Sequence, residues 1–338
     1  MNRILIIPGI GRTSLQLGRF LTESFQTLRV PSDLFCYNPE RFRGIPSRLA
    51  GSFSKRLLFY ALHRFKPTVL LSMTAVLLKP PLLREIKEKF GITLANWCID
   101  DPLFLKESIT VLPFYDFFFT HNPASEVFRC STGATHVSIL TFGCSPTRHR
   151  KLSLSQREKA YYGSDVAFVG EVSLERKVIL EALSDVDLKI WSKREISSLK
   201  EGKVVFTPVE RDDLLYSHFM GKPAWGEEMV KVYNASKVLL NIHSMGGEGT
   251  NMRTFEVTGC GGFLLLDHHA HLEELLQPGK ECVQFENTKD LRDKVHYYLA
   301  HDEEREEIAE RGYEKTHHSH TYVHRAKELL SCLNSRSQ

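Results

Sequence analysis

Short apolar runs alternate with helix-length amphipathic segments along the first half of the chain. The runs are continuous and not alternating in polarity, which is typical of strands that are buried on both faces of a parallel sheet. Strands are expected at residues 3–8, 33–37, 68–72, 92–97, 116–120 and 136–140. Apolar residues at helical spacing predict helices at 13–28, in the basic stretch after the second strand, and at 81–90.

The same alternation begins again at residue 165. Strands are expected at 166–169, 188–191, 203–206, 238–242 and 262–267. Helices are expected at 173–184, 227–235, 252–258, 271–276, 288–300, 303–314 and 322–333. The pattern predicts two doubly wound, Rossmann-like α/β domains that face a central cleft. We place them at 1–150 and 151–338, with the last helix as a candidate to return to the first domain.

Length and composition agree with two globular domains. The chain has 338 residues, of which 42% are hydrophobic and 25% charged. Its apolar runs are far shorter than the roughly 20 residues of a membrane helix, and the first residues read as a strand and not as a signal peptide. We therefore expect a soluble, cytoplasmic protein. The seven cysteines form no C-x-x-C pair, which argues against a disulfide framework and a cysteine zinc site.

Charge is distributed unevenly between the halves. Residues 1–150 hold 19 Lys and Arg against 10 Asp and Glu, a balance of +9 that leaves −6 for the rest of a chain of net charge +3. From Arg41 to Arg84 there are nine Lys and Arg and no acidic residue. Such a segment is either a solvated helix face or a surface for an acidic acceptor or a membrane. No recognised motif supports binding of nucleic acid.

The most informative segment is NIHSMGGEGTNMRTFEVTGCGGFLLLD, residues 241–267. A buried strand leads into a glycine-bearing loop, a helix and the next strand, and helix starts at such positions bind phosphate. Arg253, in the first helical turn, is placed to contact a diphosphate. Glu256 is placed to accept hydrogen bonds from a ribose diol, and Glu248 to reach the sugar. The alternative is that Glu248 and Glu256 are solvated surface carboxylates without a binding role.

This segment resembles the E-x7-E region of retaining GT-B glycosyltransferases, and more narrowly the CgeB-like (spore maturation protein) glycosyltransferase family. Further similar stretches are AFVGEVSLERKVILEAL at 167–183, GKPAWGEEMVKVYNASKVLLNIH at 221–243, the tail from 287 to 330, and NWCIDDP at 96–102. The resemblance covers nearly all of the second half but few points of the first. It implies a GT-B fold and transfer of a sugar from a nucleoside-diphosphate sugar to an unknown acceptor.

The resemblance also implies roles for single residues. Gly170 would let the donor diphosphate approach a strand end, and Arg176 would contact phosphate unless it is a solvated helix residue. Trp191 and Trp225 lie where such enzymes hold the base, although Trp191 could equally be a core residue. Arg253 would bind the diphosphate, Glu256 the ribose and Glu248 the sugar hydroxyls. The expected donor-binding residues are thus Gly170, Arg176, Trp191, Trp225, Arg253, Thr254, Phe255 and Glu256.

In the first half, Asp100 and Asp101 follow a predicted strand and precede a proline. They could orient an acceptor hydroxyl or act as a base, or one of them could cap a helix. Gly9 and Gly11 form the first strand-to-helix turn and bring the backbone close to the cleft, which makes them further candidate nucleotide-binding residues. A lone G-x-G is weak evidence for a nucleotide. Retention, which the paired glutamates favour, needs no protein nucleophile. Inversion would need a base such as Asp100, Asp101 or His121.

The histidines complete no recognisable metal site, and GT-B transfer typically needs no bound metal. We therefore expect no metal and no cofactor other than the donor substrate. Two alternatives to a glycosyltransferase remain open at this point. One is a catalytically silent protein of the same fold that serves binding or assembly, and the other is a nucleotide-sugar epimerase.

Overall fold

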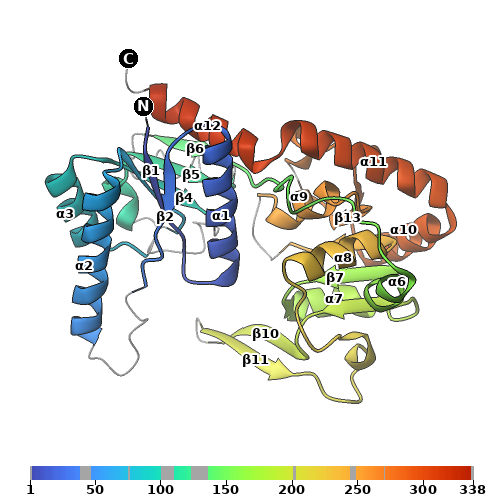
Figure 1. Cartoon of the computed structure of the whole chain (residues 1–338). Coiled ribbons are helices and arrows are strands. Elements are labelled where there is room, and N and C mark those ends of the chain that lie inside the picture. Colours follow the sequence, from blue (N-terminus) through green and yellow to red (C-terminus); the bar gives the residue numbers. More distant parts are fainter. Residues whose placement is uncertain are drawn as a thin grey trace. The chain divides into compact units, whose positions relative to one another are not determined.

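The computed structural model divides into two compact units, Met1–Thr141 with Tyr322–Gln338, and Phe142–Thr321. The boundary expected from the sequence lies at 150/151. The residues that the structure describes are 2–38, 47–74, 77–99, 110–122, 136–200, 203–243, 249–269 and 271–335. Each unit is an α/β layer structure around its own parallel sheet (Figure 1).

The first unit contains a six-stranded sheet in the order β2-β1-β3-β4-β5-β6, with every neighbouring pair parallel. The strands are β1 (Ile4–Ile7), β2 (Ser32–Leu34), β3 (Val69–Ser72), β4 (Thr93–Cys98), β5 (Phe117–Thr120) and β6 (Val137–Ile139). β1, β3 and β5 are buried along their whole length, as their continuous apolar sequence predicts. The strand order reverses between β1 and β3, which makes this the switch point of the sheet.

The helices of the first unit cover this sheet. They are α1 (Arg12–Thr27), α2 (Ser47–Phe65), α3 (Pro80–Phe90), the 3-10 helix η1 (Leu112–Phe114) and α12 (Tyr322–Asn334). The last helix, α12, contacts α1 although the two lie at opposite ends of the chain. The Tyr322 ring stacks on Phe20 with 5.4 Å between centroids and meets the buried Trp97 edge-on. The last helix of the chain is therefore part of the first unit.

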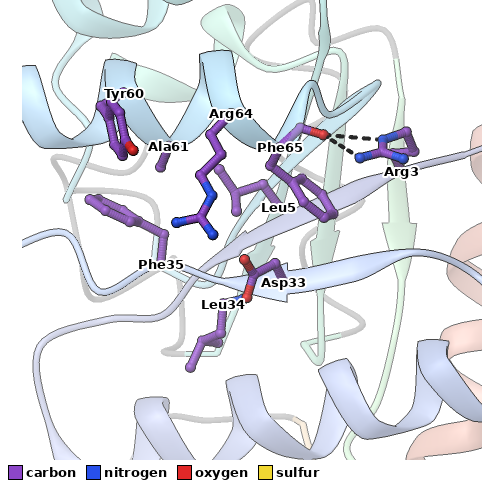
Figure 2. Close-up of a pocket in the computed structure, with 9 residues that line it drawn as sticks. All are labelled: Arg3, Leu5, Asp33, Leu34, Phe35, Tyr60, Ala61, Arg64 and Phe65. Carbon is purple, nitrogen blue, oxygen red and sulfur yellow. Dashed lines mark hydrogen bonds between the residues drawn. The ribbon is translucent and has the colours of Figure 1, made fainter.

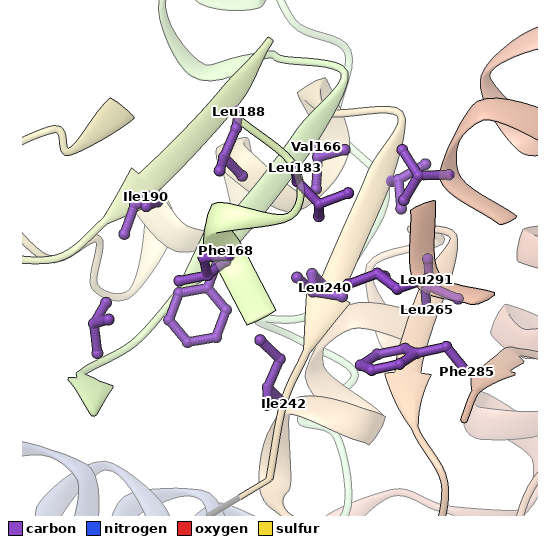
Figure 3. Close-up of a cluster of buried hydrophobic side chains, with 14 of the residues drawn as sticks. Val166, Phe168, Leu183, Leu188, Ile190, Leu240, Ile242, Leu265, Phe285 and Leu291 are labelled. Carbon is purple, nitrogen blue, oxygen red and sulfur yellow. The ribbon is translucent and has the colours of Figure 1, made fainter. Parts of the chain in front are cut away.

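The second unit contains a five-stranded parallel sheet in the order β14-β13-β12-β7-β9. The strands are β7 (Val166–Val169), β9 (Leu188–Trp191), β12 (Val238–Asn241), β13 (Leu264–Asp267) and β14 (Val283–Phe285). The helices are α6 (Gln156–Tyr162), α7 (Leu174–Glu181), η3 (Tyr216–His218), α8 (Glu227–Ala235), α9 (Met252–Gly259), η4 (Leu272–Glu274), α10 (Thr288–Ala300) and α11 (Asp302–Ser319). Val166, Phe168, Leu240 and Leu265 from the central strands form the middle of its main core (Figure 3).

Several elements differ from the sequence expectation. Residues 203–206 do form a strand, but it belongs to an antiparallel hairpin of β10 (Glu195–Lys200) and β11 (Lys203–Pro208), which joins β8 (Val172–Ser173) outside the parallel sheet. The helix expected at 271–276 is only the short η4. β14 and α6 were not expected. None of the described helices combines the length and apolar composition needed to cross a bilayer.

Two glycines in helices allow the packing around α2 and α11 to be tested by substitution with alanine. The added methyl group would meet open space at one position and backbone atoms at the other. At Gly51 in α2, a Cβ atom would meet nothing within 4 Å, whereas at Gly312 in α11 it would lie 2.4 Å from the backbone oxygen of Glu281. We expect Gly51→Ala to stabilise the protein by about 0.5–1 kcal/mol through helix propensity. Gly312→Ala should destabilise it by about 1–3 kcal/mol through overpacking.

Thermal and urea unfolding of the two variants beside the wild type measure both effects. Because the substitution and the helical context are the same, each variant is the control for the other. Stabilisation by Gly312→Ala would contradict the close approach of α11 to Glu281.

Candidate functional site

The candidate donor site lies in the second unit, at the carboxyl ends of β7 and β12. The strand order reverses between these two strands, and ligands of open α/β sheets bind at such a point. Gly170 follows β7, and Ile242 and His243 follow β12. α9 begins at the same edge, where the Asn251 side chain caps it by accepting a hydrogen bond from the backbone N–H of Arg253 at 2.9 Å.

Arg253 and Gly170 are packed directly against each other. Gly170 has φ +154°, which L residues with side chains rarely adopt, and a Cβ atom here would lie 2.9 Å from Nη2 of Arg253. Only glycine therefore allows the guanidinium to approach the strand end. Arg253 is half-buried, and its buried Nε has no hydrogen-bond partner. No salt bridge joins it to a residue that the structure describes, but its charge acts on the buried carboxyl of Glu256. An anion at the strand end would add a further negative partner for the guanidinium.

Arg176 contributes a second positive charge. Its guanidinium also donates hydrogen bonds to two backbone segments. Its Nε and Nη2 donate to the backbone oxygen of Ile242 at 3.0 and 2.7 Å, and its Nη1 donates to that of Glu171 at 2.9 Å. These bonds join the end of β12 to the β7–α7 connection. Burial, followed by the positive charge of Arg253, lowers the pKa of Arg176 to about 10. The two guanidinium groups thus lie close enough to destabilise each other's charge, a situation that a bound anion relieves.

Glu256 lies one turn after Arg253 in α9 and is almost completely buried, with 6% of its surface exposed. Burial raises its pKa from 4.5 to about 7, although Arg253 acts in the opposite direction. Its carboxylate accepts no hydrogen bond from the described residues. A neighbouring group that sequence reasoning missed is Tyr233 of α8, whose buried hydroxyl lies close to both Arg253 and Glu256. Burial raises the pKa of Tyr233 well above 10, and the Glu256 charge adds to this effect.

A second group that sequence reasoning missed fixes the start of α9. Nδ1 of His243 lies 2.6 Å from Oδ1 of Asp267 at the end of β13, and Oδ2 of Asp267 accepts the backbone N–H of His243 at 2.9 Å. Nε2 of His243 accepts the backbone N–H of Asn251 at 3.3 Å. Since Nε2 is an acceptor, the imidazole proton is assigned to Nδ1 and donated to Asp267. Asn251 also exchanges amide hydrogen bonds with Asn241 of β12.

Other expected donor-binding residues are placed in the protein interior. Thr254 and Phe255 are fully buried; Thr254 accepts a hydrogen bond from Asn241, and Phe255 packs on His320 with 5.1 Å between ring centroids. Trp191 is also fully buried, in a core cluster where it stacks on Tyr162. These contacts fit a structural role for all three.

Trp225, in contrast, is 40% exposed. It directly precedes Gly226, the N-cap residue of α8. An indole in this position is accessible to a ligand, which leaves Trp225 as a candidate for contact with the base.

Gly9 and Gly11 lie in the first unit, in the turn between β1 and α1. A Cβ atom at Gly9 would collide with the side chain of Thr74 at 2.4 Å, so Gly9 permits close contact between the ends of β1 and β3. Gly11 is the N-cap of α1. Both border an open hollow of about 340 Å³ that also includes Arg12 and Tyr37.

The three expected catalytic residues, Asp100, Asp101 and Glu248, lie outside the described residues, so their roles stay predictions. In the part of the chain that the structure describes, no group of three or more His, Cys, Asp or Glu side chains is arranged to hold a metal ion. The expectation of a metal-independent reaction also stays a prediction.

Sequence comparisons give two matches. Residues 176–331 match the family model described as glycosyl transferase-like. The chain is also 21% identical over 269 residues to the spore protein CgeB of Bacillus subtilis (strain 168), a match that covers 75% of this chain and 79% of that protein.

Comparison with solved structures extends the similarity to nearly the whole chain. Sucrose-phosphate synthase from Thermosynechococcus elongatus has a TM-score of 0.69 at 10% identity, with 99% of both chains covered. Anabaena HepE in complex with UDP-glucose has a TM-score of 0.68 at 12% identity, covering 99% of this chain and 100% of that one. These similarities confirm the predicted GT-B fold and the predicted resemblance to CgeB, and they identify residues 176–331 as a glycosyltransferase-like region.

Proposed function

We propose that this protein transfers a sugar from a nucleoside-diphosphate sugar, with uridine as the base, to an acceptor, and that it retains the configuration of the sugar. The observation that carries this proposal is the guanidinium of Arg253, half-buried at a sheet switch point beside Gly170 and without an ion-pair partner among the described residues. The glycosyl transferase-like match of residues 176–331 supports the activity. The choice of uridine rests on HepE, which binds UDP and UDP-glucose.

The chemistry follows from where the positive charge lies. When the bond between sugar and diphosphate breaks, negative charge builds up on the leaving diphosphate. Arg253 and the free N–H groups at the start of α9 stabilise that charge, an electrostatic effect that is usually large in such sites. Glu256 accepts hydrogen bonds from the ribose hydroxyls. These bonds offset the cost of removing its carboxylate from water. The acceptor oxygen then attacks on the face that the leaving group vacates, and its proton passes to the departing diphosphate. Glu248 holds the sugar hydroxyls.

The first test measures UDP binding by calorimetry at fixed salt. We expect Arg253→Gln to weaken UDP binding roughly 10- to 100-fold, as for loss of a hydrogen-bonded charge pair, and to change uridine binding little. Arg253→Lys should be intermediate, because it keeps the charge but loses the planar pair of donors. A matched control is Arg292→Gln, which removes a surface arginine paired with Asp185 at 2.7 Å and should leave UDP binding unchanged. Unaltered UDP binding by Arg253→Gln would refute the diphosphate site.

The second test is turnover without an acceptor, using UDP-glucose, UDP-galactose and UDP-N-acetylglucosamine. We expect slow release of UDP, with the α anomer of the sugar appearing first in proton NMR spectra, since these donors are α-linked. Arg253→Gln should lower the rate at saturating donor because the stabilised charge develops in the transition state. First appearance of the β anomer would contradict retention. UDP binding without turnover would favour the silent protein, and formation of an epimeric sugar would favour the epimerase.

The third test uses the titration of Glu256. Its pKa is raised to about 7 from 4.5, so between these pH values the unfolded chain releases a proton that the folded protein keeps. Stability therefore falls as pH rises through this window, by on the order of 3 kcal/mol for this one group. The free energy of unfolding of Glu256→Gln should equal that of the wild type near pH 4.5 and exceed it above pH 7.

Urea unfolding across this pH range measures the difference between variant and wild type. Glu306→Gln, an exposed residue on α11, provides the control and should show no such divergence. If the stability of Glu256→Gln ran parallel to that of the wild type at every pH, the burial of a carboxyl with raised pKa would be wrong.

A further inference from the structure

The helix α2 in the first unit carries two apolar faces, and only one of them is used by the core. One face packs inward through residues that are less than 5% exposed: Ala50, Ser54, Leu58 and Leu62. The other face points outward, with Leu49, Phe53, Leu57 and Tyr60 exposed by 62%, 49%, 41% and 64%. These four follow one another at three or four residues, so they form a single stripe along the helix. We call this set of residues the outer stripe.

The chain segment that carries the outer stripe is basic. The segment from Arg41 to Arg84, which contains α2, has nine Lys and Arg and no Asp or Glu. Arg56 and Arg64 are exposed and lie within the turns of the stripe, and neither forms an ion pair with a described residue. Lys55, on another side of α2, is held by Glu85 of α3. The face is therefore both apolar and positively charged.

The outer stripe ends beside a pocket of about 430 Å³ between α2 and the edge strand β2. Figure 2 shows Arg64 extending from α2 into this pocket, with its guanidinium between Phe35 and Asp33. Arg3, also at the pocket, is occupied, because Nε and Nη2 donate to the backbone oxygen of Phe65 at 3.1 and 2.5 Å. Among the described residues of the lining, Asp33 is the one acidic side chain. At the end of the outer stripe, Arg64 therefore lies in the same pocket as the aromatic rings of Phe35, Tyr60 and Phe65.

We propose that the outer face of α2 docks this protein on the surface of a membrane that contains anionic phospholipids. The helix lies in the plane of the interface, with Leu49, Leu57 and Tyr60 at the boundary between headgroups and acyl chains. Arg56 and Arg64 contact headgroup phosphates. This combination of an exposed apolar stripe with flanking arginines is how interfacial helices bind, and each basic residue near an anionic surface strengthens binding.

The charge distribution favours a membrane over a second copy of this chain. In a two-fold symmetric dimer the same patch would face itself, which would bring one acid-free basic segment against another. The exposed apolar residues Leu199 and Val204 of the β10–β11 hairpin lack this one-sided charge, since Glu195 and Glu210 accompany the lysines there. Exposed apolar surface alone therefore does not distinguish the outer stripe, whereas its combination with positive charge does.

The test is co-sedimentation of the full chain with vesicles of phosphatidylcholine, alone or mixed with phosphatidylglycerol, without any donor. We expect binding to the mixed vesicles that weakens at high salt, and little binding to phosphatidylcholine alone. Arg56→Gln with Arg64→Gln should weaken binding by about fivefold for each charge removed. Leu57→Ser with Tyr60→Ser should weaken it by about tenfold or more, because less apolar area enters the interface.

The matched control is Leu199→Ser, which removes an exposed leucine from the hairpin and should leave vesicle binding unchanged. Thermal unfolding of every variant verifies that the fold is retained. Equal binding to both kinds of vesicle, or no effect of the four α2 substitutions, would overturn the proposal. So would absence of vesicle binding together with a dimer that these substitutions dissociate, because the face would then be a protein interface. None of these results depends on the donor site of the second unit.

Discussion

The guanidinium of Arg253 next to Gly170 is the constraint around which the second unit's sheet edge is organised. A half-buried guanidinium that forms no salt bridge with a described residue is costly even beside the buried carboxyl of Glu256, so the surrounding structure has to hold it there. Asn251 fixes the first turn of α9, and His243 with Asp267 fixes Asn251. This chain of contacts connects the ends of two strands with the start of one helix. The proposed diphosphate would bring further negative charge to this guanidinium.

Most strands of the two parallel sheets could be predicted from the sequence, because they are continuous apolar runs, as in β7 and β12. The sequence was insufficient where strands are short or solvated. β14 has only three residues, and β10 contains two serines and ends in a lysine, so neither shows the pattern of a buried strand. β11 is exposed along its whole length and is held by its pairing with β10, which buries only Ile196 and Ser197. α6 was missed although its capping box of Ser155 and Glu158 is visible in the sequence.

The candidate site could be located from the sequence, but the direction of each side chain could not. Arg253, Thr254 and Phe255 are consecutive, yet successive residues of a helix point about 100° apart, and the second and third turn into the core. His243 and Asp267 are 24 residues apart in sequence. They meet because β12 and β13 pair in parallel with Asn241 opposite Leu266. Polar residues just after two apolar runs were a visible signal for this pair, but the strand register was not.

The packing of α12 on α1 has a consequence for how the protein is made. The first unit needs Tyr322 to cover Phe20 and Trp97, and this residue is synthesised after all of the second unit. During translation, the second unit is therefore completely synthesised before the first. Until then, the N-terminal part of the first unit has an apolar face that α12 does not yet cover. Domains normally complete folding in the order of their synthesis; here the unit that begins the chain is the last to be completed.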